Sequence, residues 1–164
     1  MSKAIEIQAP NKLVRKDGYI SIFLGGSIEM GQAIDFQRII IDATTNMPYI
    51  YFNPRRTNWD SSWEQVKDNK EFREQIEWEL DALESADVIL MYFDPKTISP
   101  ISLLELGMFS HSKKMIVCCP EGYVRKGNID IICEKYKIRQ VDSLDGLVNI
   151  FINGDIDELY IINE

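Results

Sequence analysis

Two glutamates lie on the apolar sides of the helices in which the sequence places them. Glu105 is the one formally charged residue in segment 97–112, with histidine taken as neutral, and its helical neighbours are Ile101, Leu104 and Met108. A carboxylate in such surroundings loses hydration unless hydrogen bonds or a ligand compensate, and this is typical of functional acids. The alternative is a glutamate that points outward, which is the default for this residue type.

The helix that carries Glu105 is predicted to begin near Ser99 and Pro100. The positive end of a helix favours an ionised carboxylate, which suits a nucleophile or a base. We therefore expect Glu105 to be ionised.

Glu79 lies inside the apolar stripe of a helix predicted over residues 70–85. The stripe residues, at helical spacing, are Phe72, Ile76, Leu80 and Leu83. The other acidic residues of this helix fall on faces that we expect to be exposed to solvent. The alternative is that Glu79 sits at the edge of the stripe and reaches solvent or an arginine.

Two carboxylates at one pocket, in different environments, support covalent glycosyl transfer. One attacks the anomeric carbon while the other manages a proton or positions the sugar. The chain offers few side chains for a metal site or a Ser–His–Asp triad, because it has one histidine and three cysteines. Cys118 and Cys119 are neighbours and would point to opposite faces of a strand. We expect no metal and no organic cofactor.

Composition bounds the class of protein. The chain has 164 residues, 45% hydrophobic and 27% charged, with a net charge of −8. This is enough for one globular core. The negative charge argues against binding of a nucleic acid polymer, and no apolar run is long enough to span a membrane. Cysteine usage is typical of the reducing cytoplasm.

Strands and helices alternate along the chain. The predicted strands are residues 19–24, 49–52, 88–93, 115–119 and 137–141, and the predicted helices are 32–45, 70–85, 101–111, 128–136 and 144–151. This order predicts a single doubly wound, mainly parallel five-stranded sheet with helices on both faces, an α/β fold of the Rossmann or flavodoxin kind. Residues 1–18 form an N-terminal extension in which 4–7 can be a peripheral strand, and 19–164 form one domain.

Ligands of such sheets bind beyond the carboxyl ends of the strands. The segments at that edge are Gly25-Gly26-Ser27, Asn53-Pro54-Arg55-Arg56, residues 94–102 and residues 120–122. We expect a ligand site among them.

Five motifs in order resemble the nucleoside 2-deoxyribosyltransferase superfamily, over residues 20–136. They are FLGGSIEMG, NPRRTNWDSSWEQ, EQIEWEL, ADVILMYFDP and SPISLLELGMF. The resemblance is closest to the deoxyribosyltransferase-like branch that is related to 2′-deoxynucleoside 5′-phosphate N-hydrolases. It implies a catalytic glutamate in the ELG motif, here Glu105, and an acid in the preceding helix, here Glu79 in place of the usual aspartate. It also implies a sugar or phosphate loop at Gly25, Gly26 and Ser27.

Two residues point to different substrates. The branch that hydrolyses monophosphates has an arginine in the first loop, where this chain has Glu29, and a negative side chain there would repel phosphate. The same branch has a serine six residues before its nucleophile, like Ser99, where nucleoside transferases use aspartate. Arg55 and Arg56 can replace the missing phosphate ligand or form surface ion pairs.

The remaining predicted substrate contacts come from three regions. Trp59 or Trp63 can stack on a nucleobase, or the two can close the loop onto the domain or another subunit. Asp60 in the same loop and Ser102 near the helix start belong to the set. Asn128 follows the fourth predicted strand, and in the family this region can reach a neighbouring subunit's pocket, so we expect a homo-oligomer.

These residues predict cleavage or transfer of the N-glycosidic bond of 2′-deoxynucleosides or their 5′-monophosphates. A non-catalytic nucleotide-sensing module on the same fold is the main alternative. A third hypothesis is metal-assisted phosphoester hydrolysis by Asp94, Asp60 and Glu105. The apolar segment 103–109 is compatible with a subunit interface, but a place in the core is the simpler interpretation.

Overall fold

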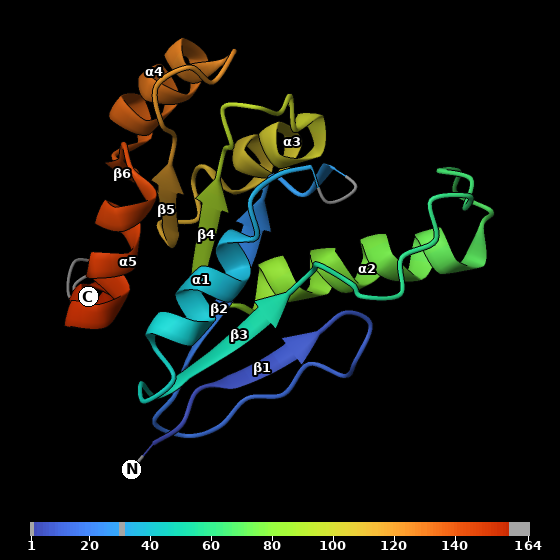
Figure 1. Ribbon diagram of the computed structural model, residues 1–164, viewed down its shortest axis with the longest axis horizontal. Coiled ribbons are helices and arrows are strands. Elements are labelled where there is room, and N and C mark those ends of the chain that lie inside the picture. The colour runs from blue at the N-terminus through green and yellow to red at the C-terminus, as the bar shows by residue number, and fades with distance from the viewer. Residues whose placement is uncertain (1, 30–31, 158–164) are drawn as a thin grey trace.

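The computed structural model describes residues 2–29 and 32–157 and contains one parallel sheet with helices on both faces (Figure 1). The strands are β1 Ile5–Gln8, β2 Ile20–Gly26, β3 Tyr49–Asn53, β4 Val88–Tyr92, β5 Met115–Cys118 and β6 Arg139–Val141. The helices are α1 Phe36–Ala43, α2 Lys70–Ser85, α3 Pro100–Phe109, α4 Lys126–Tyr136 and α5 Leu144–Asn153, followed by the short 3-10 helix η2 Asp155–Asp157. Met30 and Gly31 of the FLGGSIEMG motif and residues 158–164 of the predicted domain lie outside the described residues.

The sheet has the order β1-β3-β2-β4-β5-β6, and all its pairs are parallel. This confirms the α/β fold of the Rossmann kind, but the prediction of five strands was one short. The additional strand is β1, which pairs with β3 from Ile5 opposite Ile50 to Gln8 opposite Asn53. Its apolar residues alternate with polar ones, as is usual for an edge strand whose polar side chains reach solvent.

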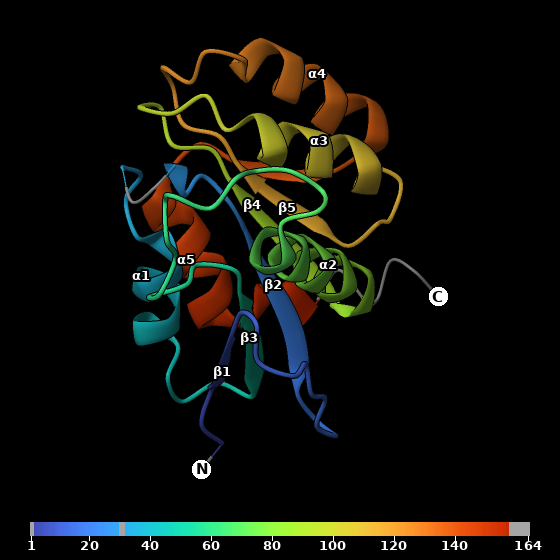
Figure 2. The same ribbon diagram turned by 90° about the vertical axis from the view of Figure 1, so that its right-hand side faces the viewer.

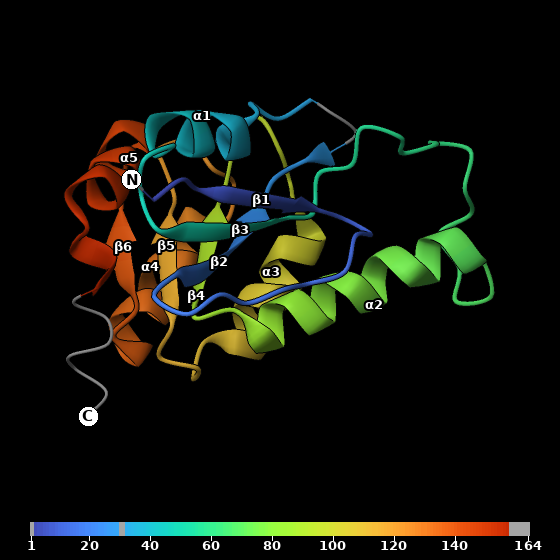
Figure 3. The same cartoon turned by 90° about the horizontal axis from the view of Figure 1, so that it is seen from below.

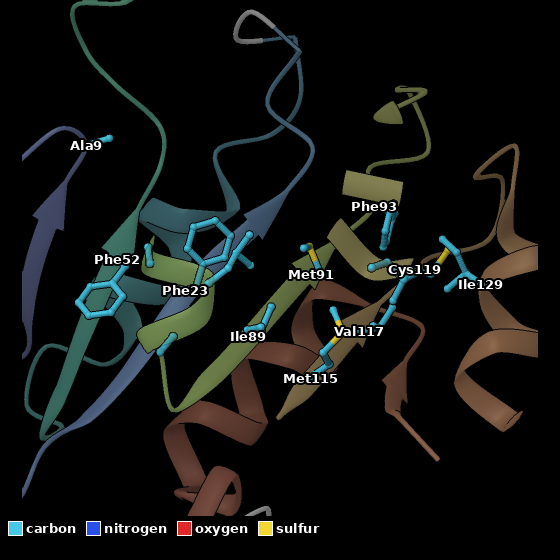
Figure 4. Close-up of a cluster of buried hydrophobic side chains, with 14 of the residues drawn as sticks. Ala9, Phe23, Phe52, Ile89, Met91, Phe93, Met115, Val117, Cys119 and Ile129 are labelled. Atoms are coloured by element: carbon cyan, nitrogen blue, oxygen red, sulfur yellow. The ribbon is translucent and has the colours of Figure 1, made fainter. Parts of the chain in front are cut away.

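The alternation of side chains along the strands divides the core into two layers. Figure 3 shows α1 and α2 on opposite sides of the sheet. Phe23, Ile89, Met91 and Val117 point to the side of α2, α3 and α4, as Figure 4 shows in part. Their neighbours in sequence point to the side of α1 and α5. Cys118 and Cys119 fall in opposite layers, as predicted, and all three cysteines are free and buried.

Two local features shape the carboxyl edge of the sheet. Gly26 has a φ of +128°, and a Cβ atom there would lie 2.1 Å from the carbonyl oxygen of Tyr92, so only glycine lets β2 and β4 approach at this point. α2 begins after Asn69, whose side chain accepts a hydrogen bond from the N–H of Phe72. Figures 1 and 3 show the N-terminal half of α2 and the loop before it projecting beyond the end of β3.

Within the described residues, no helix is both long enough and apolar enough to cross a bilayer.

Candidate active site

A cavity of about 870 Å³ opens at the carboxyl edge of the sheet. Its walls are the end of β2, the loop after β3, the projecting half of α2 and the first turns of α3. This volume is that of a small-molecule site. The predicted site residues that line it are Glu79, Glu105, Gly25, Gly26, Glu29, Arg55, Arg56, Trp59, Ser99 and Ser102.

Glu105 is buried at the wall of this cavity, with 8% of its surface exposed. Its side chain makes no hydrogen bond or ion pair with any part of the chain that the structure describes. Burial raises the pKa of Glu105 to about 8, and repulsion by Glu79 adds to the shift. The expectation that the helix terminus keeps Glu105 ionised was therefore wrong. Glu105 is the sixth residue of α3, where the field of the terminus has fallen, and the loss of hydration dominates.

Glu105 is buried for a reason different from the one that the sequence indicated. Ile101, Leu104 and Met108 were taken as its buried surroundings, but they are 55%, 59% and 52% exposed. α3 instead packs through Ser102 and Leu106. Because this helix is apolar on every side, its hydrophobic pattern does not indicate which side faces the sheet.

Glu79 faces Glu105 across the same cavity and is held by an amide. Gln75, one turn earlier and 4% exposed, donates a hydrogen bond from Nε2 to Glu79 Oε1 at 2.7 Å and another to the carbonyl of Pro54 at 3.0 Å. Burial raises the pKa of Glu79 to about 7, although the Gln75 hydrogen bond acts against it. Sequence reasoning missed Gln75, and its spacing of four residues from Glu79 was the available signal.

The predicted apolar stripe of α2 serves two purposes. Its end at Leu83 is fully buried against the sheet, whereas Phe72 and Ile76 line the cavity together with Glu79. The core contacts of the helix are instead made by Trp78 and Ala82. The division follows from the projection of α2 beyond the strands, which leaves its first turns without a sheet to pack on.

The hydroxyl groups near the start of α3 bond to one another. Ser27 Oγ lies 2.6 Å from Ser99 Oγ and 2.8 Å from Thr97 Oγ1, and all three residues are buried. Ser27 also accepts a hydrogen bond from the N–H of Asp94. This cluster joins the end of β2 to the segment that leads into α3, and Ser27 does not line the cavity.

Arg55 and Arg56 line the cavity, but each is held by protein groups. Arg55 donates to the side chain of Gln37 at 3.3 Å and lies 3.6 Å from a carboxylate oxygen of Asp35. Arg56 donates to Asn58 and Gln75, and its guanidinium lies 5.2 Å from the centre of the Trp63 ring. These contacts fix the loop after β3.

The two tryptophans of this loop contact each other edge to face, with ring centres 4.9 Å apart. Trp59 lines the cavity, whereas Trp63 does not. An aromatic side chain of this loop is thus part of the cavity wall.

Besides Ser27, the predicted residues Asp60 and Asn128 do not line the cavity, and the three acids of the metal hypothesis do not form a cluster. Asn128 is exposed on α4, and Asp60 is exposed in the loop, where it caps Ser62. Asp94 is buried and accepts hydrogen bonds from the N–H groups of Ile34 and Lys96. Asp94, Asp60 and Glu105 are not brought together, and residues 2–29 and 32–157 contain no group of three His, Cys, Asp or Glu that could hold a metal ion.

A parallel α/β sheet with an acidic, ligand-sized cavity at its carboxyl edge defines a small-molecule domain of the Rossmann-like class. The chain belongs to the family described as nucleoside 2-deoxyribosyltransferase like, whose model matches residues 19–123. A comparison with curated protein sequences gives no match. A solved structure of similar fold is that of a conserved protein from Enterococcus faecalis V583, with a TM-score of 0.56 and 11% identity, covering 81% of this chain and 97% of that one. At this identity the likeness concerns the fold alone.

The raised pKa of Glu105 predicts a pH-dependent effect on stability. Its pKa rises from an ordinary 4.5 to about 8, so the folded protein keeps a proton that the unfolded chain releases, and stability falls as the pH rises between these values. Glu105→Gln removes this penalty. We expect its Tm to exceed that of the wild type by roughly 5 °C or more at pH 8.5, with little difference at pH 5, in thermal unfolding followed by circular dichroism.

The matched control is Glu134→Gln on the exposed side of α4, which should change the Tm little at either pH. An equal Tm for Glu105→Gln and the wild type at pH 8.5 would contradict the buried position of this carboxyl group.

Proposed function

We propose that the protein cleaves or transfers the N-glycosidic bond of 2′-deoxynucleosides or their 5′-monophosphates through a covalent bond to Glu105. The family implies a nucleoside-type small molecule as ligand and an enzyme as the general class. The observation that carries the proposal is the side chain of Glu105, buried at a cavity wall with no protein partner in the described chain. A buried acid without a partner lowers the stability of the protein. Such a costly position is typical of a residue that interacts with a bound ligand.

The reaction has two steps. In the first, a carboxylate oxygen of Glu105 attacks C1′, the C1′–N bond breaks, and the base leaves with its electron pair and takes up a proton. In the second, water or another base attacks C1′ of the ester and frees Glu105. Water gives the free sugar, and a base gives a new nucleoside. The sugar carbon becomes positively charged in both transition states, and a carboxylate at contact distance stabilises that charge.

The raised pKa of Glu79 supports a role for this residue as proton donor to the leaving base. Its pKa of about 7 and that of Glu105, about 8, describe two carboxyl groups that repel each other and hold one proton between them near neutral pH. The proposed reactive form has the proton on Glu79 and the charge on Glu105. Because the pKa of Glu79 is the lower of the two, this is the less populated form of the singly protonated pair. Gln75, which holds Glu79 Oε1, acts as a positioning residue.

We also propose a homo-oligomer that pairs through the outer side of α3. Here Ile98, Ile101, Leu104 and Met108 are each more than half exposed. Figure 2 shows α3 next to α4. Segment 97–112 has no charged residue except the buried Glu105. In a chain with a net charge of −8, an uncharged side is the one on which two copies meet without repulsion. A location in the cytoplasm is part of the proposal and agrees with the three free cysteines.

The first test follows release of free base by chromatography from a panel of 2′-deoxynucleosides and their 5′-monophosphates, with and without a second base. The wild type should release base, and Glu105→Ala should lose at least about 10³-fold in rate because the nucleophile is absent. Glu84→Ala, on an exposed part of α2, serves as the control and should stay active. Saturable binding with all ligands recovered intact would favour the sensing module, and full activity of Glu105→Ala would reject the mechanism.

The pH dependence of kcat/KM tests the roles of the two acids. We expect a bell-shaped profile whose limbs lie near pH 7 and pH 8, because only the singly protonated pair reacts. Glu79→Gln should lose the limb at high pH, where the donor ionises. The remaining acid limb should not move to lower pH, because it marks the loss of the first proton, which leaves while the partner carboxyl group is still neutral. A profile unchanged by this substitution would exclude Glu79 as the donor.

Light scattering after size-exclusion chromatography tests the oligomer. A dimer has twice the chain mass of 19.0 kDa, that is 2 × 19.0 = 38.0 kDa. Leu104→Glu should give 19.0 kDa, because a charge would be buried between the subunits. Ile39→Glu, an equally drastic change on the outer side of α1 across the sheet, should leave the mass unchanged. A wild type that elutes as a monomer would remove the proposal.

A further inference from the structure

The carboxylate of Glu29 sits at the start of α3. Its Oε1 accepts hydrogen bonds from the N–H groups of Ile98 at 2.8 Å and Ser99 at 2.5 Å. Ser99 itself does not cap the helix, because its hydroxyl is bonded to Ser27 and Thr97. The N-terminal end of α3 is therefore capped by an acid from the loop after β2.

This capping places a negative charge where an anionic ligand would otherwise bind. The start of a helix attracts phosphate through its free N–H groups and its positive potential. Here two N–H groups beside that start are already bonded to a carboxylate, and Glu29 itself lines the cavity. A phosphate that approached this end of the cavity would meet a like charge.

The cations of the cavity do not offset this charge. The basic residues of the lining, within the described chain, are Arg38, Arg55 and Arg56. Arg38 is paired with Glu6 at 2.9 Å, Arg55 lies 3.6 Å from Asp35, and Arg56 lies 3.9 Å from Glu74. By contrast, Glu29, Glu79 and Glu105 have no ion pair with any described residue. A bound phosphate needs charge-assisted donors, and these arginines are already engaged.

Glu29 can accept a hydrogen bond from a neutral group. Its second oxygen, Oε2, has no partner among the described residues. Ser99 and Glu105 are separated by six residues, about 9 Å along a helix, and a glutamate side chain in a helix leans back toward the N-terminus. A furanose whose C1′ contacts Glu105 can thus direct its hydroxymethyl group toward Glu29.

We infer that Glu29 selects substrates with a free 5′-hydroxyl group, so that the protein acts on 2′-deoxynucleosides and excludes their 5′-monophosphates. The inference rests on the proposed function for the identity of the sugar. Its physical basis is that the lining arginines of the described chain are all paired with acids, whereas the Glu29 carboxylate has no ion pair there and keeps Oε2 free of protein donors. The hydroxyl donates to Glu29, whereas a phosphate has no proton to donate and is repelled.

The test compares one 2′-deoxynucleoside with its own 5′-monophosphate. The wild type should show a kcat/KM at least about 100-fold higher for the nucleoside, the size expected for juxtaposed like charges. Glu29→Gln keeps an oxygen for the N–H groups of Ile98 and Ser99 and removes only the charge. It should lower the ratio of kcat/KM for the nucleoside to kcat/KM for the monophosphate at least about tenfold, mainly by lowering KM for the monophosphate. Glu134→Gln removes the same charge from the exposed side of α4 and should leave the ratio unchanged.

Calorimetry separates this inference from the proposed reaction. In the Glu105→Gln background, where no turnover is expected, the nucleoside should bind at least about tenfold more tightly than the monophosphate, and Glu29→Gln should remove the difference. Selective binding without base release by the wild type would support the role of Glu29 while rejecting the reaction. Base release with the monophosphate preferred, or a ratio unaffected by Glu29→Gln, would overturn the role of Glu29 and leave the reaction intact. Failure of the nucleoside to bind at all would overturn both.

Discussion

The site depends on one costly arrangement, a carboxyl group held away from water with no cation or hydrogen-bond donor paired to it in the described chain. Glu105 is 8% exposed, and its nearest charged influence is another acid, Glu79. Burial raises the pKa of both carboxyl groups because a charge in a poorly hydrated cavity loses solvation, and repulsion by Glu79 adds to the shift of Glu105. This arrangement keeps a proton on the pair near neutral pH. Under the proposed reaction, the remaining carboxylate is poorly stabilised until the positively charged sugar carbon is beside it. The reactivity and the instability of the site therefore have a common origin.

Polar groups around the site maintain this arrangement by forming hydrogen bonds within the protein. The hydroxyls of Ser27, Thr97 and Ser99 form a buried cluster that fixes the end of β2 to the approach to α3. Gly26 lets the two central strands meet closely at the same place. Because α3 carries Glu105, any movement of its start would move the carboxyl group. α2 then supplies the opposite wall, and it can do so only because its first turns extend past the sheet.

The sequence was informative where a feature is local. Residues 70–85 were predicted as a helix and form α2 with these bounds, since a cap at Asn69 and a regular apolar stripe mark it. The strands followed from short β-branched runs ended by glycine or proline. The burial of Glu105 was predicted from neighbours that are in fact exposed, because periodicity does not orient a helix that is apolar on all sides. The cap by Glu29 joins residues about seventy positions apart, and nothing in the local pattern indicates it. The same holds for the hydroxyl cluster, which tertiary contact alone creates.

The charge distribution of the cavity unites these observations. The arginines that line it are paired with Glu6, Asp35 and Glu74, so their charges are partly compensated within the wall. Its acids without an ion pair in the described chain are Glu29, Glu79 and Glu105. Glu29 lies beside the start of α3, Glu105 in the second turn of α3, and Glu79 on the facing helix α2. Such a cavity stabilises a cationic centre and a neutral hydroxyl, and it disfavours a dianion. Under the proposed reaction, the excess of acidic groups in the cavity assists departure of the base at C1′. The same excess favours a hydroxyl group over a phosphate at the 5′ position.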